Sequence, residues 1–495
     1  MLSEILAASL LTLTSLVYLY YRWCFRYWKN RGVYTLTPSI PFGNGANKIL
    51  SRTCFALDLK DYYFILKNKG LRYGGLYFGT SPLFFVTDLD LIKDMLTTNF
   101  QHFTDHPFFV DEKSDPLSGH LLFLKGEKWK KFRAKLSPSF TSSKIKMMFE
   151  NIRKCARGLE DLIEETIAKN EIFNARDAMN RFTTDVIGSC GFGIEINSLK
   201  NPNNEFRKHG DQIFTPSFKR EFFISIATYV PKLMNYLIIN LHDKGQINFF
   251  FNTTKETVEY REKHNYVRKD FLQQLIQLKK ADNEVTMADI ASNIYVFFLA
   301  GYETSATTTT FLLYELAANK NIQGKVREEV RYVLDKYNGE ITYEALMEMA
   351  YLDKCVQETL RKYPAFPILN RICTKTYKVP ESDLVIEKGT VVLICLFGIQ
   401  SDPEYYPDPQ VFDPERFSEE AKSTRDNFTW LPFGEGPRIC IGLKLGVIQI
   451  KMAIASLIRS YKFSVNSKTQ IPMKFNEKGF SLTAKGGIWL NAEKC

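Results

Sequence analysis

The loop around Cys440 has the residue types needed to hold a metal ion through one thiolate. Glycines and prolines surround the cysteine, and such a loop can approach a flat ligand closely and present backbone N–H groups to the sulfur. A helix-like sequence begins at Leu443, so the positive end of a helix dipole and the charge of Arg438 are expected to favour the thiolate. A buried structural cysteine is the alternative interpretation. The surrounding residues are Pro432, Gly434, Gly436, Pro437 and Gly442.

A second group of reactive side chains lies in a long helical pattern predicted over residues 287–319. Ala300, Thr304 and Thr308 recur every four residues and therefore share one helix face. The Thr304 hydroxyl can bond back to the Ala300 carbonyl, which opens a small polar notch in an otherwise apolar wall. With Glu303 beside it, this hydroxyl can relay protons. A structural kink with a capped threonine is the alternative.

Two further pairs are spaced to meet on helix faces. An amphipathic segment over residues 126–136 presents Trp129 and Arg133 at i, i+4. An indole N–H and a guanidinium on one face suit a carboxylate ligand, whereas an ordinary solvated helix with one buried tryptophan is the alternative. Glu358 and Arg361 are spaced i, i+3, which by itself predicts a modest surface ion pair.

Composition and cysteine usage limit the class of protein. The chain has 495 residues, 45% of them hydrophobic and 24% charged, so it can bury a large cofactor in one extended globular core. The net charge of +10 favours an acidic partner or an anionic membrane surface. Because the sequence has no dense basic motif of a known nucleic-acid reader, we expect no nucleic-acid partner. The nine cysteines are odd in number and lack a Cys-x-x-Cys pair, which favours a reducing compartment.

The N-terminal segment has the length and composition of a membrane anchor. Ile5–Tyr21 carries no charge and spans roughly 26 Å as a helix, close to the hydrocarbon thickness of a bilayer. Aromatic and basic residues follow it, which predicts a single-pass anchor with the C-terminal mass in the cytoplasm. A cleaved signal peptide is the alternative, but its basic residues should precede the apolar run, where Glu4 stands instead. We therefore expect an anchor (1–22), a basic, proline-containing hinge (23–44) and one catalytic domain (45–495).

The body of the chain is expected to be mainly α-helical with a minor β portion. Helical patterns dominate from about residue 125 to 365, whereas short strand-like runs occur between residues 76 and 87 and between 384 and 396. No internal repeat interrupts the pattern. Residues 212–250 are unusually apolar for a connection, and core packing and membrane contact are both consistent with them.

Taken together and in order, these motifs resemble those of the cytochrome P450 family. The pattern Phe433-x-x-Gly436-x-Arg438-x-Cys440-x-Gly442 is similar to that family's haem-binding loop. The segment Ala300–Thr304 resembles its oxygen-activating helix, and the Trp-x-x-x-Arg pair resembles its propionate-binding helix. Runs such as Leu136–Ser142 further resemble the insect microsomal group that metabolises xenobiotics. The resemblance implies the cytochrome P450 fold in a single catalytic domain with an N-terminal transmembrane helix.

The resemblance also implies a role for individual residues. Cys440 would be the axial ligand of the haem iron, and Thr304 and Glu303 would deliver protons. The other cofactor-binding residues would be Trp129, Arg133, Ala300, Arg371, Phe433, Gly436 and Arg438, with Glu358, Arg361 and Arg416 as a structural triad. By matching segments, the expected substrate contacts are Phe108, Phe109, His120, Leu121, Phe123, Phe297, Phe298, Phe366, Ile368, Leu369, Phe480 and Leu482.

The activity implied by the resemblance is that of a haem-thiolate monooxygenase. Such an enzyme inserts one oxygen atom of O2 into a lipophilic substrate such as a xenobiotic, plant toxin, insecticide, or endogenous lipid or hormone. Its cofactor is haem b, and its electrons come from NADPH through NADPH-cytochrome P450 reductase, with cytochrome b5 as an additional candidate partner. The implied location is the cytoplasmic face of the endoplasmic reticulum membrane.

Two alternative functions and two departures from the family pattern accompany this interpretation. A haem-thiolate isomerase or dehydratase would need no reductase, and a non-enzymatic haem carrier or sensor would need no proton relay. Ile439, Lys444 and Leu445 differ from the residues more usual in the family. These residues are expected to alter the packing on the thiolate side of the haem and the docking of the reductase there.

Overall fold

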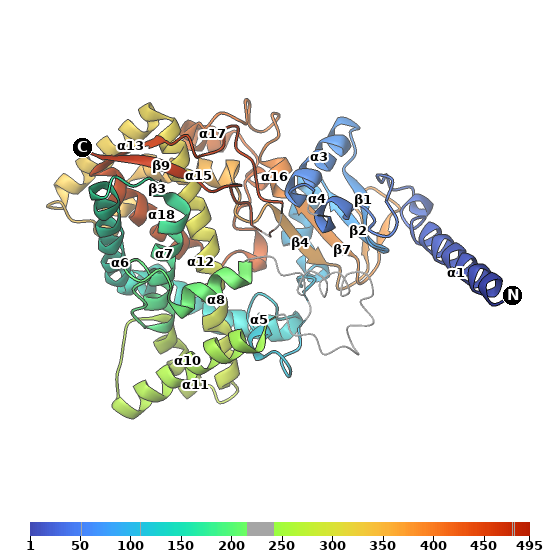
Figure 1. Cartoon of the computed structure of the whole chain (residues 1–495), viewed down its shortest axis with the longest axis horizontal. Helices are drawn as coiled ribbons and strands as arrows, with labels where there is room; N and C mark the ends of the chain where they lie inside the picture. The colour runs from blue at the N-terminus through green and yellow to red at the C-terminus, as the bar shows by residue number, and fades with distance from the viewer. Residues whose placement is uncertain (51, 109, 215–241, 478, 480) are drawn as a thin grey trace.

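The computed structural model describes residues 1–495 except 51, 109, 215–241, 478 and 480. The described part is mainly helical, and its β-rich portion lies beside the base of the N-terminal helix α1 (Figure 1). The expected mainly α architecture with a minor β portion is therefore confirmed. The α-helices are α1 Leu2–Cys24, α2 Ala46–Ile49, α3 Phe55–Asn68, α4 Leu89–Lys93, α5 Gly126–Leu136, α6 Ser142–Ala168, α7 Ala175–Ile187, α8 Glu205–Phe214, α10 Lys244–His264, α11 Phe271–Ala281, α12 Met287–Ala318, α13 Lys320–Lys336, α14 Tyr343–Glu348, α15 Ala350–Lys362, α16 Leu396–Ile399, α17 Glu419–Ser423 and α18 Leu443–Ile458.

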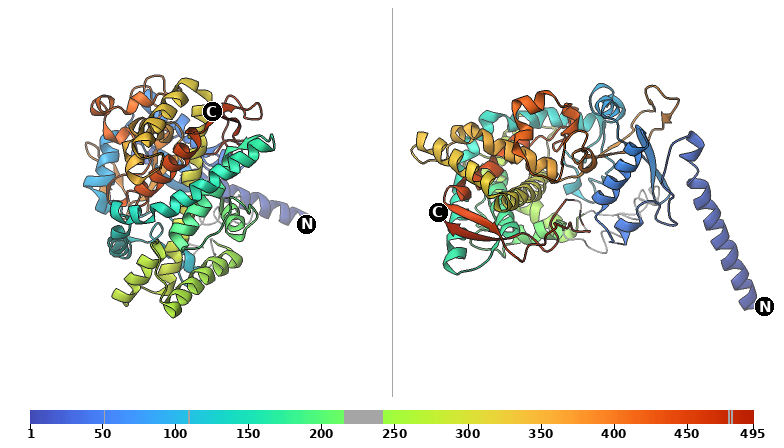
Figure 2. Two further views of the ribbon diagram at one scale, coloured as in Figure 1. Left: turned by 90° about the vertical axis from the view of Figure 1, so that its left-hand side faces the viewer. Right: turned by 90° about the horizontal axis from the view of Figure 1, so that it is seen from above.

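Helix α12 runs through the centre of the body and positions the residues of its middle turns. It begins at a capping box in which the Thr286 hydroxyl accepts from the Asp289 N–H and the Asp289 carboxylate accepts from the Thr286 N–H. Most of its residues are buried, because α7, α10 and α18 pack around it (Figure 2). A helix covered on most sides reads as apolar nearly all round, as this one does.

The largest sheet carries Arg371, one of the expected cofactor-binding residues. Its strand order is β1-β2-β7-β4, with β2 and β7 parallel and the other pairs antiparallel. Within it, Arg371 on β4 lies opposite Val392 on β7. A second sheet has the order β3-β9-β8, and β5 pairs with β6. The strands are β1 Tyr73–Phe78, β2 Ser81–Val86, β3 Phe173–Asn174, β4 Ile368–Ile372, β5 Tyr377–Lys378, β6 Val385–Ile386, β7 Val391–Cys395, β8 Tyr461–Val465 and β9 Trp489–Lys494.

The elements that carry the sequence motifs have nearly the predicted bounds. The predicted segments 126–136 and 287–319 correspond to α5 and α12, and the helix expected from Leu443 is α18. The strand-like runs between residues 76 and 87 and between 384 and 396 correspond to β1, β2, β6 and β7. Of the apolar stretch 212–250, most lies outside the described residues, while Phe250 on α10 is buried in the core.

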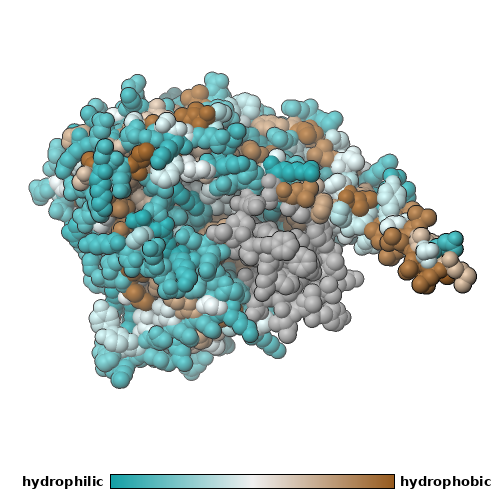
Figure 3. All heavy atoms as spheres, in the orientation of Figure 1, coloured by the Kyte–Doolittle hydropathy of each residue, from teal (hydrophilic) through white to brown (hydrophobic). Residues whose placement is uncertain are grey.

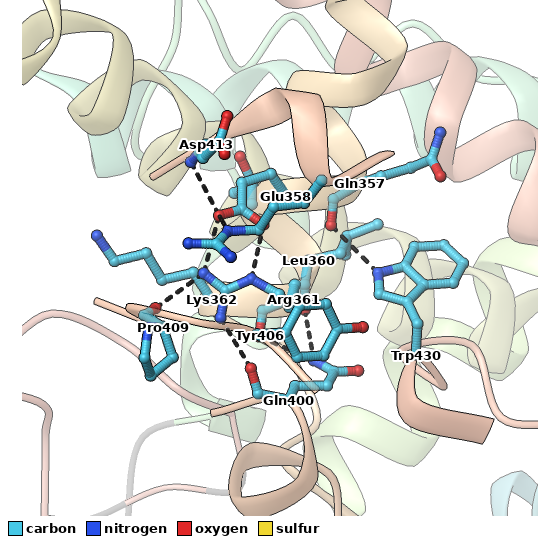
Figure 4. Close-up of polar contacts among 12 residues, drawn as sticks. Gln357, Glu358, Leu360, Arg361, Lys362, Gln400, Tyr406, Pro409, Asp413 and Trp430 are labelled. Carbon is cyan, nitrogen blue, oxygen red and sulfur yellow. Dashed lines mark hydrogen bonds and ion pairs between the residues drawn. The ribbon is translucent and has the colours of Figure 1, made fainter. Parts of the chain in front are cut away.

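The Glu358–Arg361 pair is buried, so the surface pair predicted from its spacing alone is wrong. Both side chains are 0% exposed. The Arg361 Nε and Nη2 atoms donate to the two oxygens of Glu358 at 2.6 and 2.8 Å (Figure 4). Arg416 completes the triad, with its Nε 3.6 Å from Glu358 Oε1. The physical reason is tertiary, since residues 400–416 fold over this face of α15.

The buried triad ties α15 to the segment that leads toward the cysteine loop. Arg361 donates to the carbonyls of Gln400 (2.8 Å) and Pro409 (2.9 Å), and the Asp413 N–H donates to Glu358 (3.0 Å). Each buried charge is thus paired and hydrogen-bonded, as burial requires. The three residues that the family resemblance grouped as a triad therefore lie in contact with one another.

Glu358→Ala is expected to lower the free energy of unfolding by about 3–5 kcal/mol, because Arg361 would be left buried without its counter-ion. Thermal or denaturant unfolding of the haem-loaded protein measures this. A matched control is Glu415→Ala, which removes the more exposed pair with Lys354 (2.8 Å) and should cost less than about 1 kcal/mol. Equal losses in the two variants would contradict a special role for the buried pair.

Candidate haem site

Cys440 lies between the 3-10 helix η10 (Gly436–Arg438) and the first turn of α18. Its backbone N–H donates to the Phe433 carbonyl (2.9 Å), which closes the loop. The Cys440 side chain is accessible, yet many protein atoms lie around its sulfur. Its accessible surface therefore faces the interior of the protein, where a ligand can meet the sulfur.

The glycines of the loop have a backbone role. Gly434 and Gly436 have φ angles of 72° and 73°, which favour glycine. A Cβ atom on Gly436 would lie 1.9 Å from the Leu96 carbonyl oxygen. The sequence suggested that these glycines make room for a flat ligand, but at Gly436 the close neighbour is the protein's own backbone.

The electrostatic environment of Cys440 differs from the one predicted. Burial raises the pKa of the Cys440 thiol, and the backbone N–H groups of Gly442 and Leu443 and the charge of Arg133 only partly oppose this. The helix N-terminus thus favours the thiolate as predicted, but burial outweighs its effect on the pKa of the thiol. A metal cation bound to the sulfur would stabilise the thiolate, since a coordinating thiol is deprotonated. The nearby guanidinium is that of Arg133, whose Nη2 donates to the Ile439 carbonyl (2.9 Å).

Arg438 extends away from Cys440 and joins the loop to the segment before α5. Its guanidinium carbon lies 3.9 Å from the centre of the Trp129 ring, and its Nη2 lies 3.5 Å from an Asp105 carboxylate oxygen. Burial, together with repulsion from Arg371, lowers the pKa of Arg438 to about 9. Its three hydrogen bonds go to the carbonyls of Thr104 (2.8 Å), Leu121 (3.3 Å) and Leu124 (2.8 Å).

The buried guanidiniums of this region carry more positive charge than the protein neutralises. Burial lowers the pKa of Arg133, and it lowers the pKa of Arg371 to about 10. The Arg371 Nε has no hydrogen-bond partner in the described part of the chain. For Arg133, Arg371 and Arg438 together, Asp105 is the one paired carboxylate among the described residues.

This excess of buried positive charge suits a ligand with carboxylates. No described residue accepts a hydrogen bond from the Trp129 indole N–H, so that donor is also available to such a ligand. A single accessible thiol together with several cationic donors is the set that haem, with an iron atom and two propionates, would use. The residues present therefore fit a haem.

A residue that the sequence analysis did not identify, His106, also lies in this region. Its Nδ1 is 3.0 Å from the Asn370 side-chain oxygen. Burial and the charge of Arg371 lower the pKa of His106 to about 3, so the ring is neutral. Nothing in the sequence around His106 indicated this position, because its neighbours come from β4.

In the middle of the mostly buried helix α12, Ala300 and Thr304 are accessible on one face. Ala300 is exposed and Thr304 half-buried, whereas Phe298 and Tyr302 are buried. The Thr304 hydroxyl donates to the Ala300 carbonyl (2.7 Å), which confirms the predicted bond. The helix remains continuous through this turn.

Glu303 lies on another side of α12, where its partners were not expected from the sequence. Both of its carboxylate oxygens accept from Arg176 Nη2 at 2.7 Å, and one also accepts from the Ser481 hydroxyl at 2.6 Å. Arg176 Nη1 donates in turn to the Thr307 hydroxyl (2.6 Å). No hydrogen bond joins Glu303 to Thr304 among the described residues. The expected relay pair is thus separated in this structure.

A polar cavity of about 380 Å³ adjoins Glu303. It is lined by side chains from α7, α8, α12 and the segment before β9, so it lies where these elements meet. A carboxylate at its wall can exchange protons with solvent. The lining residues are Arg176, Asn180, Asp211, Phe214, Glu303, Asn476, Glu477, Gly479, Ser481 and Thr483.

The predicted substrate contacts differ in accessibility. Phe108, Phe123, Phe297, Ile368 and Leu369 are partly accessible and Phe366 is exposed, so these side chains can meet a ligand. The side chains of His120, Leu121, Phe298 and Leu482 are buried in protein packing. Phe298, for example, packs against Phe250 and Tyr302 at ring distances of 5.2 and 5.6 Å. Phe109 and Phe480 lie outside the described residues.

The basic residues of α5 are only partly free. Lys128 pairs with Glu112, and Lys135 pairs with Asp282. Lys130 and Lys131 are exposed and form no ion pair with the described residues. These two lysines are therefore available to an acidic partner.

Comparisons with known proteins identify the family of the chain. The family model described as Cytochrome P450 matches residues 57–491. The chain is 40% identical to Probable cytochrome P450 6a21 of Drosophila melanogaster, over 99% of each chain. It is 39% identical to Cytochrome P450 6A1 of Musca domestica, over 97% of this chain and 96% of that one. It is 37% identical to Cytochrome P450 6k1 of Blattella germanica, over 98% and 96%. The chain belongs to the cytochrome P450 family, and it is a haem-dependent monooxygenase of that family.

Proposed function

We propose that this monooxygenase oxidises lipophilic small molecules of the xenobiotic type, bound against the accessible face of α12. The observation that carries the proposal is the accessible but interior Cys440 sulfur, together with the accessible face that Ala300 and Thr304 form on the mostly buried helix α12. The accessible candidates Phe108, Phe123 and Leu369 are aromatic or apolar, which supports a lipophilic substrate.

The protein's own residues hold the cofactor and move protons. Cys440 would hold the haem iron through its sulfur, and Arg133, Arg371 and Arg438, with the Trp129 indole, would hold the propionates. When bound, the haem supplies the iron at which dioxygen is activated with electrons from NADPH. Apolar side chains around the substrate exclude water.

In this proposal, two residues of α12, Glu303 and Thr304, deliver protons. Glu303 takes protons from the polar cavity at its side, where Arg176 and Ser481 hold it. Thr304 presents its hydroxyl on the accessible face. A water molecule, or a rotation of the Glu303 side chain, is needed to connect the two, because they share no direct bond here.

The membrane and the electron donor complete the proposal. α1 is long and apolar enough to cross a bilayer, with a mean hydropathy of 1.7 and no buried residue, and we propose that it anchors the enzyme in the endoplasmic reticulum membrane with the body in the cytoplasm. NADPH-cytochrome P450 reductase would dock on the thiolate side, where Lys130 and Lys131 can attract an acidic partner. Cytochrome b5 is a candidate for the same surface.

Cys440→Ala is expected to abolish the thiolate–haem band in the reduced, CO-bound difference spectrum. It should also abolish NADPH-dependent oxygen consumption that is stimulated by a lipophilic substrate in the presence of reductase. Cys495→Ala, at an exposed cysteine, is the control and should keep both. If the band survived in Cys440→Ala, another cysteine would be the ligand.

Thr304→Ala is expected to retain the CO difference spectrum but to release a several-fold larger share of the electrons from NADPH as hydrogen peroxide, because the hydroxyl on the accessible face is lost. Thr309→Ala is a matched control, since its hydroxyl makes the same kind of bond, to the Ser305 carbonyl (2.7 Å), at a buried position. Peroxide formed per NADPH consumed is the measurement. Unchanged coupling in Thr304→Ala would remove this residue from the relay.

The Arg176–Glu303 contact can be tested by a double-mutant cycle on coupling. Arg176→Gln and Glu303→Gln should each lower product formed per NADPH, and the double variant should be no worse than the poorer single variant, because both act through one carboxylate. The control is Arg181→Gln on the same helix, which pairs with Asp177 instead (2.5 Å). Additive losses would mean that Arg176 acts independently of Glu303.

A further inference from the structure

Hydrogen-bonded turns connect the anchor helix α1 directly to the body. Backbone bonds of helical type run on past its end, from the Phe25 N–H to the Tyr21 carbonyl (2.9 Å) and from the Asn30 N–H to the Arg26 carbonyl (2.8 Å). The 3-10 helix η1 (Lys29–Arg31) completes this run. The apolar helix is thus followed directly by hydrogen-bonded turns, with no long connection between it and the body.

Trp28, within this continuation, is fully buried against strand β1. Its indole N–H donates to the Leu76 carbonyl (3.1 Å), and its backbone N–H donates to the Tyr77 hydroxyl (3.0 Å). The same hydroxyl donates to the Phe25 carbonyl (3.0 Å), so one strand residue holds two positions of the helical segment. A Cβ atom on Gly75 would lie 2.3 Å from the indole ring, so a side chain there would exclude the tryptophan.

The residues that follow Trp28 are also held on the sheet. Val33 is buried, and the Gly75 N–H donates to the Tyr34 carbonyl (2.8 Å). Arg31 pairs with Glu387 (2.6 Å), although this pair is partly exposed and contributes little. The segment expected to be a hinge between anchor and body is therefore packed against β1 at its first half.

We propose that α1 and the catalytic body form one rigid unit, so that the anchor gives the body a single orientation on a lipid bilayer. The inference rests on the membrane insertion of α1 proposed above. Figures 1 and 2 show α1 projecting from the β-rich end, and Figure 3 shows that its outer part is mostly hydrophobic. A bilayer that contains α1 must then meet the body at this end, with the exposed Tyr20 and Trp23 near the interface.

The orientation of the haem reports the orientation of the body. The full-length, haem-loaded enzyme is placed in aligned phosphatidylcholine bilayers, and linear dichroism of the haem absorption band is measured. A defined dichroism is expected for the wild type. Trp28→Ala, and separately a Gly-Ser-Gly insertion between Cys24 and Phe25, should each lower it at least two-fold. Tyr332→Ala on α13 is the control, because this aromatic side chain is 65% exposed on the body, makes no contact with the anchor segment and should leave the dichroism unchanged.

The insertion variant makes the test decisive, because it changes no residue of the body. Flotation with phosphatidylcholine vesicles is measured first, and a wild type that does not float would overturn the proposed anchoring itself. If Trp28→Ala loses the CO difference spectrum, it no longer binds the haem that the dichroism measures. The insertion variant then tests the rigid connection by itself. If the protein floats and the insertion leaves the dichroism unchanged, the surface of the body sets its orientation and the rigid connection is wrong. A floating wild type without dichroism would overturn it as well.

Discussion

The site depends on Arg438, which connects segments that are more than 300 residues apart in the chain. One guanidinium holds the carbonyls of three residues before α5, stacks on Trp129 and faces Asp105. Cys440 follows two residues later, so the same contacts that order the segment before α5 also fix the position of the thiol. Five donors in a rigid fork make arginine suited to this task, whereas a lysine would bind one or two of these acceptors.

Helix α12, which carries Glu303 and Thr304, presents two faces of different chemical character. Because residues of an α-helix are about 100° apart, Glu303 and Thr304 are neighbours in the chain but point in different directions. Thr304 therefore lies on the accessible face, while Glu303 reaches Arg176 and the polar cavity. This arrangement keeps a charged carboxylate away from the apolar substrate face and still places it one helical position from the hydroxyl.

The sequence allowed prediction of the parts of the site that rest on local spacing. The bounds of α5 and α12, the Trp129–Arg133 face and the bond from Thr304 to Ala300 follow from helix periodicity. The partners supplied by tertiary structure were not predictable. Arg176 and Ser481 have no spacing relation to Glu303, and the carbonyls bound by Arg438 have no residue-type signal. The Glu358–Arg361 pair was expected at the surface but is buried. A favoured thiolate was expected at Cys440, but burial raises the pKa of that thiol.

The charge balance of the site links the cofactor to the stability of the fold. At neutral pH, below the lowered pKa values of Arg371 and Arg438, both guanidiniums are charged, so the cost of burying them is fully present. Asp105 offsets only part of it. A ligand with two carboxylates that binds the folded state would offset more, and its binding energy would add to the stability of the folded protein. Removing the haem should therefore loosen first the contacts that Arg438 makes, because they surround the charges that the ligand neutralises.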